Sequence, residues 1–295
     1  MVPCPWCGAP AEVHFTGCAD LEYFTPCDAD YRRCPSCGLI FLHPLPSREE
    51  LAALYPPEYQ NFDGPRSRLS RWLTDRYHDR HAALCRRHLP PGGRVLEVGC
   101  ADGALLDRLA SAGYEVAGVE VSKDACERAW DRGLPVFCGT LEEMPGDDTF
   151  DLVFAGHLIE HTLDPLATAT AIADRLRPGG VAYLETPNVG SLDARLWRHR
   201  WGLIHYPRHL YLFDRRTLTA LCERAGLRVE QLRWEPNPCG WALSLQGALR
   251  RAGIDRSRNP RSWYYPALLA LLAPLNLVDL AFGGTAFMAA LARKP

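Results

Sequence analysis

The sequence lacks an excess of charge of one sign, because 33 Lys and Arg against 35 Asp and Glu leave a formal net charge of -2 over 295 residues. This balance gives no global electrostatic reason to expect a nucleic acid or an anionic membrane as partner. The N-terminus, MVPCPWCGAP, lacks the basic and apolar regions of a signal peptide. The most apolar tract, residues 262–278, is short for a bilayer span and is interrupted by Pro274 and Asn276. We therefore expect a cytoplasmic protein without a transmembrane span.

Cysteine, in contrast, is abundant, with 12 residues. Six lie within the first 37 residues, and the others are scattered through segments with regular hydrophobic patterns, as Cys85, Cys100, Cys126, Cys138, Cys222 and Cys239. Scattered thiols of this kind are typical of a reducing compartment.

Four of the N-terminal cysteines form two CxxC pairs. Cys4 and Cys7 precede Gly8, and Cys34 and Cys37 precede Gly38. This spacing predicts a zinc-ribbon-like module over residues 1–45, in which four thiolates close the coordination of a structural Zn²⁺. Redox-active CxxC pairs are the alternative, but no thioredoxin-like βαβ pattern surrounds them. Two more cysteines, Cys18 and Cys27, could replace a ligand or stay free.

A linker over residues 46–65, with a short helix at 47–55, separates this module from a regular pattern. A helix from residue 66 ends at the sequence PPGG, and strands then alternate with helices. The strands are expected at 94–98, 114–120, 134–138, 150–155 and 180–186, and the helices at 103–112, 123–132 and 165–177. This alternation predicts an α/β fold with a parallel, doubly wound sheet.

Two further elements follow. A helix is expected at 214–226, with Asp214 as N-cap and Gly226 as its stop, and it leads into a strand at 227–234. Residues 283–295 can form a last strand, which would be antiparallel to the others.

The turn after the first of these strands, Gly99-Cys100-Ala101-Asp102-Gly103, does not have the GxGxxG spacing of a dinucleotide site. An acid at Glu97 would repel a pyrophosphate but would suit a cationic ligand. Glu120 ends the next strand, where a carboxylate can accept hydrogen bonds from both ribose hydroxyls. Together these features favour S-adenosylmethionine over NAD.

At this point the chain resembles the class I S-adenosylmethionine-dependent methyltransferases, over residues 66–295. The resemblance rests on LEVGCADG, GVEVS, FDLVFAGHLIEHTLDP, LRPGGVAYLETPN and HLYLF, which occur in family order, although Ala101 replaces the middle glycine of the first motif. It implies a Rossmann-like sheet of seven strands. It also implies a set of cofactor-binding positions: Glu97, Gly99, Cys100, Ala101 and Gly103 at the methionine end, Glu120 and Val121 at the ribose, Thr140 and Leu141 near the adenine, and Gly156 and His157 beside them.

The loop after the fourth strand, with the sequence HLIEH, lies beside the transferred methyl group in this family. His157, His161 and the more distant His209 are therefore candidates to act as a base or to align the acceptor. The alternative for His161 is that it only caps or packs a helix. Ubiquinone-pathway O-methyltransferases have a similar ExxEH patch that holds a divalent metal, and here His157 replaces its first Glu. A second metal near Glu160 and His161, with His205 or His209, would then be zinc or a transition metal.

Two insertions in the methyltransferase pattern separate later elements. The first, at 187–213, mixes arginines with aromatic residues, which could hold an anionic or aromatic acceptor or could form a solvated loop. The second, at 241–283, is expected to form a helical lid, a homodimer surface or a lipid-facing surface.

The sequence therefore predicts a methyltransferase for a small-molecule acceptor, of the secondary-metabolite, sugar or lipid-precursor type, acting by O-methylation. The alternative is an RNA methyltransferase that docks through the zinc module, although the charge balance makes nucleic acid a poor partner. A third hypothesis is a binding module that keeps the fold without turnover, which the intact cofactor positions disfavour.

Overall fold

A computed structural model describes residues 2–55, 68–257 and 261–295. Its main feature is a seven-stranded sheet in the order β11-β12-β9-β8-β5-β6-β7. The strands are β5 (Arg94–Val98), β6 (Glu115–Glu120), β7 (Val136–Cys138), β8 (Phe150–Gly156), β9 (Leu176–Pro187), β11 (Arg228–Glu235) and β12 (Phe287–Arg293). β5 to β9 are parallel, and β12 is antiparallel to both β9 and β11. The predicted fold class and the antiparallel last strand are confirmed.

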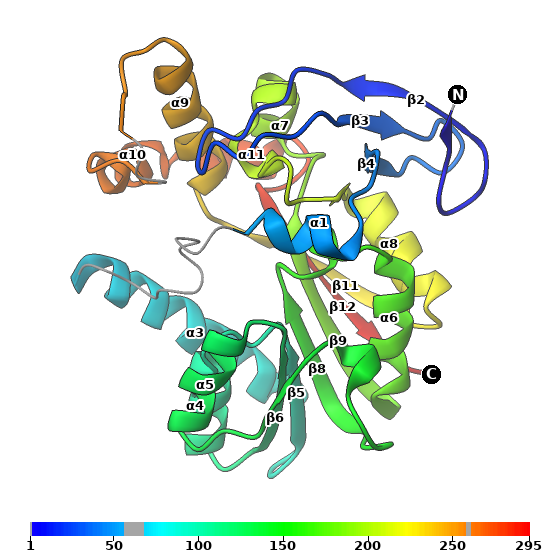
Figure 1. Cartoon of the computed structure of the whole chain (residues 1–295). Coiled ribbons are helices and arrows are strands. Elements are labelled where there is room, and N and C mark those ends of the chain that lie inside the picture. Colours follow the sequence, from blue (N-terminus) through cyan, green and yellow to red (C-terminus); the bar gives the residue numbers. More distant parts are fainter. Residues whose placement is uncertain (1, 56–67, 258–260) are drawn as a thin grey trace.

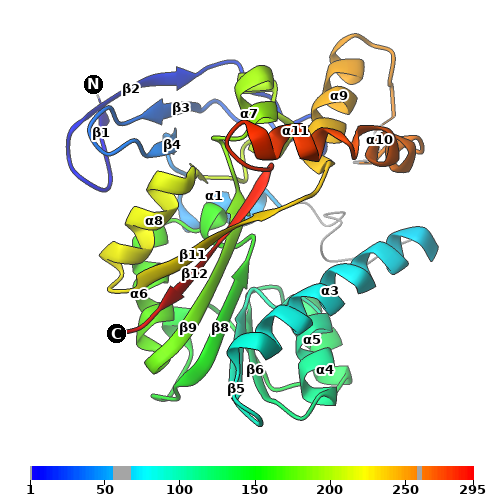
Figure 2. The ribbon, with the colours of Figure 1, turned by 180° about the vertical axis from the view of Figure 1, so that it is seen from behind.

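Helices cover both faces of this sheet (Figures 1 and 2). α3 (Arg68–His88), α4 (Ala104–Ser111) and α5 (Lys123–Asp131) lie on one face, and α6 (Pro165–Asp174) and α8 (Arg215–Arg224) lie on the other. Successive side chains of β5 point to opposite faces of the sheet. Val95 belongs to the same hydrophobic cluster as Leu109 of α4, and Leu96 belongs to the same cluster as Leu218 of α8.

The predicted helix at 165–177 is wrong at its C-terminal end. α6 ends at Asp174, and β9 begins at Leu176. Leu176 is fully buried and pairs with Phe150 at the start of β8, so tertiary burial in the sheet overrides the local helical pattern. The boundaries of α8 are as predicted, with Asp214 as N-cap and Gly226 in the left-handed conformation after the last turn.

The N-terminal residues form a second, antiparallel sheet, which includes a strand from the first insertion. Its strands are β1 (Val2–Pro3), β2 (Pro10–Phe15), β3 (Asp30–Arg33), β4 (Ile40–His43) and β10 (Tyr211–Leu212). Helix α1 (Arg48–Ala53) follows β4 in the chain. Since β10 pairs with β4, the cysteine module is joined to the part of the chain that forms the seven-stranded sheet by backbone hydrogen bonds. The predicted linker lies outside the described residues from residue 56 onward.

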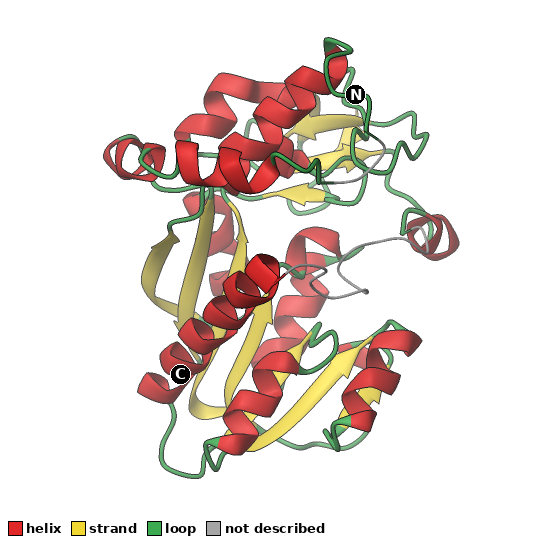
Figure 3. Ribbon diagram, turned by 90° about the vertical axis from the view of Figure 1, so that its left-hand side faces the viewer, coloured by secondary structure: helices red, strands yellow, loops and turns green. Residues whose placement is uncertain are grey.

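The two insertions supply further helices. They are α7 (Leu192–Trp197), the 3-10 turns η3 (Arg198–Arg200) and η4 (Gly202–Ile204), and α9 (Cys239–Arg251), α10 (Tyr265–Leu272) and α11 (Leu275–Ala281). With the N-terminal sheet they form a layer above the carboxyl ends of the parallel strands (Figure 3). No helix in the described part of the chain is long and apolar enough to cross a bilayer. Trp263 and Leu277 are 91% and 74% exposed, and lipid or dimer contact through this region stays a prediction.

Candidate functional site

The turn predicted to bind the cofactor, residues 99–103, joins β5 to α4 at the carboxyl edge of the sheet and is called the cofactor turn below. Gly99, Ala101 and Gly103 have φ angles of 76°, 47° and 74°, which form a tight left-handed turn. A Cβ atom at Gly103 would lie 2.3 Å from Leu134 Cδ1, so the third position needs glycine for both space and conformation. Ala101 adopts the same conformation at some cost in free energy, because it carries a Cβ.

Glu120, at the end of β6, holds this turn in place. Its Oε2 accepts a hydrogen bond from the Ala101 amide at 2.9 Å, and its Oε1 accepts one from the Ser122 amide at 2.8 Å. Each carboxylate oxygen has a further lone pair, so the group can still accept hydrogen bonds from ribose hydroxyls. Val121 follows with 68% of its surface exposed, which offers an apolar contact beside that position.

Glu97 is buried at the end of β5 next to the same turn. Burial raises the pKa of its carboxyl well above the usual range, and the carboxylates of Asp102 and Glu120 add to the shift. Its Oε2 has no hydrogen-bond partner among the described residues. A buried carboxyl oxygen without a hydrogen-bond partner fits a cationic ligand group, such as the ammonium of the methionine end of S-adenosylmethionine.

Three other predicted cofactor residues present little side chain to this edge. The Cys100 thiol lies in the core, since it would be only 2.7 Å from a Cβ placed on Gly118. Leu141 is 3% exposed, and Thr140 begins η1 (Leu141–Glu143) with its amide donating to the Glu143 carboxylate. At Cys100, only backbone atoms are therefore available to a ligand.

His157 follows β8 and Gly156, close to the cofactor turn. Its Nδ1 lies 3.5 Å from Glu160 Oε1, and its Nε2 lies 3.3 Å from Glu185 Oε1. Burial alone would lower the pKa of His157, but these two carboxylates raise it to about 10. The ring is therefore an imidazolium at neutral pH and cannot accept a proton there, which counts against His157 as a base.

Sequence reasoning missed Glu185, which lies in β9 within the motif LETPN. Its carboxylate also contacts His81 of α3, with Nε2 of the ring 2.8 Å from Oε2. The Tyr183 hydroxyl donates to the same oxygen at 3.3 Å. The available signal was an acid inside an otherwise apolar strand, because buried carboxylates occur where charged or polar partners meet them.

Glu160, His161 and His209 form the second part of the cluster. One potential ligand atom from each lies within 4.8 Å of the others. The rings of His161 and His209 are 4.5 Å apart between centroids. Burial lowers the pKa of His161 to about 4, and burial also holds the pKa of His209 well below its usual value. His209 Nδ1 lies 2.9 Å from the Leu203 carbonyl, so its Nε2 keeps a free lone pair.

The predicted residue His205 does not join this group, because its Nε2 pairs with Glu22 at 3.0 Å. Sequence reasoning also missed Tyr55, which follows α1 and places its hydroxyl 2.8 Å from His161 Nδ1. The N-terminal part of the chain therefore contributes directly to the cluster.

Arg208 fixes the segment that carries His209. Its guanidinium is fully buried and donates to both oxygens of Asp20, at 2.8 and 3.0 Å. Its carbonyl oxygen lies 3.1 Å from His161 Nδ1. The ion pair thus connects the cysteine module to the histidine cluster.

The four cysteines of the CxxC pairs meet in one cluster. The sulfur atoms are 3.6 Å apart between Cys4 and Cys37 and 3.5 Å apart between Cys7 and Cys34, and all four lie within 4.8 Å of one another. Tetrahedral zinc with Zn–S bonds of about 2.3 Å places its sulfur atoms roughly 3.8 Å apart, so the cluster has the size of a zinc site.

A family model described as a methyltransferase domain matches residues 69–232. The ubiquinone biosynthesis O-methyltransferase of Chromobacterium violaceum is 32% identical over 120 residues, which cover 37% of this chain and 48% of that protein. The protein of the same name from Cereibacter sphaeroides is 29% identical over 176 residues, which cover 52% of this chain and 69% of that one. The chain thus spans about half the length of the first of these relatives.

Solved structures share the fold at low sequence identity. Phosphoethanolamine N-methyltransferase 2 of Haemonchus contortus aligns with a TM-score of 0.55 and 18% identity over 87% of this chain and 62% of that one. The [4+2]-cyclase SpnF aligns with a TM-score of 0.51 and 21% identity over 74% of this chain and 80% of that one. These similarities establish the fold alone, whereas the family match covers more than half of the chain. The chain therefore belongs to the methyltransferase-domain family.

Proposed function

We propose that this methyltransferase acts on a hydroxyl oxygen of a small-molecule acceptor. The observation that carries the proposal is the cluster of His157, Glu160, His161 and His209 beside the cofactor turn. A Cβ placed on Gly99 would lie 3.2 Å from Leu158, so the turn and the cluster adjoin each other. The names of the O-methyltransferase relatives support the choice of oxygen and of a small acceptor.

The residues of the turn would hold the cofactor, which supplies an electrophilic methyl group on a sulfonium. Glu97 would bind its ammonium, and Glu120 would bind its ribose. The imidazolium of His157, whose two N–H groups face Glu160 and Glu185, would hold both carboxylates in place beside the cofactor and would thereby fix the acceptor site rather than act as a base.

We further propose that Glu160, His161 and His209 hold a divalent metal ion. Glu160 Oε1 is buried and accepts no hydrogen bond in the described residues, with His157 Nδ1 at 3.5 Å, and the ring of His209 has a free Nε2. Mixed imidazole and carboxylate ligands suit zinc or another transition metal. Such an ion would act as a Lewis acid and lower the pKa of an acceptor hydroxyl.

The Cys4, Cys7, Cys34 and Cys37 cluster would hold a structural Zn²⁺. Four thiolates complete a tetrahedral site and leave no position for a substrate. Each CxxC pair and the glycine after it form a tight backbone turn. Gly8 and Gly38 have positive φ, and their amides donate to the carbonyls of Cys4 and Cys34 at 2.9 Å.

The function is tested by incubating the purified protein with methyl-labelled S-adenosylmethionine and a cell extract separated into RNA, protein, polar-metabolite and lipid fractions. Label is expected in the polar-metabolite or lipid fraction, and label confined to RNA or protein would refute the proposal. Glu160→Gln should reduce transfer at least 100-fold. Glu127→Gln, the same change at an exposed position of α5, should leave transfer unchanged.

Metal analysis tests the second ion separately. The wild type and Glu127→Gln should contain two metal ions per chain, and Glu160→Gln should contain one. A single ion in the wild-type protein, removed by substitution of Cys34, would contradict the proposed metal at Glu160.

A further inference from the structure

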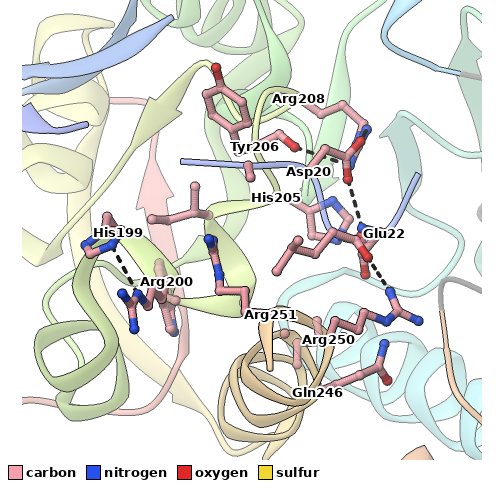
Figure 4. Close-up of a pocket in the computed structure, with 17 residues that line it drawn as sticks. Asp20, Glu22, His199, Arg200, His205, Tyr206, Arg208, Gln246, Arg250 and Arg251 are labelled. Carbon is pink, nitrogen blue, oxygen red and sulfur yellow. Dashed lines mark hydrogen bonds and ion pairs between the residues drawn. The ribbon is translucent and has the colours of Figure 1, made fainter. Parts of the chain in front are cut away.

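A shallow pocket lies where three parts of the chain meet: residues 19–22 of the N-terminal segment, residues 199–208 of the first insertion, and the C-terminal end of α9 (Figure 4). It encloses about 500 Å³ of empty space, the region open to solvent included. An open pocket of this kind suits the end of a ligand better than a whole buried molecule.

The acidic side chains of the pocket already have cationic partners. Asp20 forms the buried ion pair with Arg208, and Glu22 pairs with His205 at 3.0 Å. Arg250 at the edge of the pocket pairs with Asp255 at 3.2 Å. The local carboxylates are therefore neutralised by residues that belong to the fold.

Two arginines add positive charge beyond these pairs. In the view of Figure 4, Arg251 of α9 lies between Arg200 of η3 and the Asp20–Arg208 pair. Across residues 2–55, 68–257 and 261–295, neither Arg200 nor Arg251 forms an ion pair with an acid. Partial burial and the guanidinium of Arg200 lower the pKa of Arg251, which shows that the two cations act on each other. An anion between them would relieve this repulsion.

The pocket also adjoins the histidine cluster. His205 forms part of its wall, and His205 Nδ1 is buried without a hydrogen-bond partner in the described chain. The His205 ring stacks on His209 at 5.1 Å, and His209 in turn contacts His161. The pocket therefore lies within two stacked imidazole rings, His205 and His209, of the proposed site of methyl transfer.

We propose that this pocket binds a phosphoryl group of the acceptor, with Arg200 and Arg251 as its ligands. Guanidinium groups donate parallel hydrogen bonds that match phosphate oxygens, and two of them can neutralise a phosphate dianion. The link to the acceptor rests on the proposed function, whereas the anion site itself depends only on the pocket.

Calorimetric titration with inorganic pyrophosphate tests the anion site. The wild-type protein should bind the probe with an affinity that decreases with salt, and Arg200→Gln and Arg251→Gln should each weaken it at least tenfold. Arg216→Gln, the same change at an exposed position of α8, should bind like the wild type. Equal binding by the wild type and both pocket variants, or no binding at millimolar pyrophosphate, would overturn the proposal. Unchanged affinity for S-adenosylmethionine shows that each variant is folded.

The labelled methyl-transfer assay tests the link to the acceptor. Pyrophosphate should inhibit transfer to the small-molecule fraction, and Arg251→Gln should raise the KM for the acceptor while affecting kcat little. Transfer that is insensitive to both changes would refute this link and leave the proposed function intact. Pyrophosphate binding through both arginines without label in any small-molecule fraction would instead refute the proposed function.

Discussion

The Asp20–Arg208 ion pair makes the sharpest prediction about stability, because both side chains are buried and the pair joins segments 188 residues apart. Asp20→Asn keeps the size of the side chain but removes its charge. The buried Arg208 guanidinium then loses its counter-ion. Removal of one partner of a buried pair costs about 3–5 kcal/mol, which corresponds to a fall in Tm of roughly 6–15 °C for a protein of this size.

The pKa of Asp20 gives an independent magnitude. Burial by itself would raise this pKa, but the hydrogen bonds and charge of Arg208 lower it to about 2 from 3.8. At about 1.4 kcal/mol per pKa unit, the difference contributes roughly 2–3 kcal/mol of stability. Because the folded-state pKa is the lower one, this contribution is present above about pH 4 and is lost as the pH falls through 2.

Urea unfolding of the wild type and of Asp20→Asn, followed by circular dichroism between pH 7 and pH 2.5, measures both effects. The difference in unfolding free energy should be about 3–5 kcal/mol at pH 7 and should decrease below pH 4. Asp28→Asn, at an exposed position of the same segment, should change stability by less than about 0.5 kcal/mol. The double variant with Arg208→Met should be less destabilised than the sum of the single variants by about 1–3 kcal/mol. A loss of less than about 1 kcal/mol in Asp20→Asn would refute the argument.

Three more predictions concern the cofactor turn and the cysteine cluster. Glu120→Ala removes the acceptor of the Ala101 amide and should weaken S-adenosylmethionine binding at least 100-fold, as measured by calorimetry. Glu115→Ala, in the same strand, should leave this affinity unchanged. Unchanged affinity in Glu120→Ala would place the ribose elsewhere. Cys34→Ser should lower the zinc content by one ion per chain and reduce Tm, whereas Cys27→Ser should keep the zinc; loss of the ion from Cys27→Ser would contradict the ligand set. Ala101→Gly should raise stability by about 0.5–1 kcal/mol in thermal unfolding, because φ at this position is 47°, and an unchanged or lower Tm would show that the turn is not strained there.

The sequence predicted the elements whose signals are local. Strands and helices of the main sheet follow from hydrophobic periodicity within about ten residues, and the cofactor turn follows from Gly99, Gly103 and the acids Glu97 and Glu120. The signal for the two CxxC turns is likewise local, since each cysteine pair and the glycine after it lie within five residues. The prediction fails at the end of α6, where Leu176 leaves a helical pattern because the sheet buries it.

The tertiary structure decided which distant side chains meet. Glu185 and His81 lie 104 residues apart, and Tyr55 and His161 lie 106 residues apart, so no periodicity in the sequence connects them. The same holds for the pairing of β10 with β4, which joins the cysteine module to the methyltransferase part. Local patterns specify backbone conformation, but a buried carboxylate or imidazole requires a specific polar partner. Only the packing of separate helices and strands determines which polar partner such a buried side chain contacts.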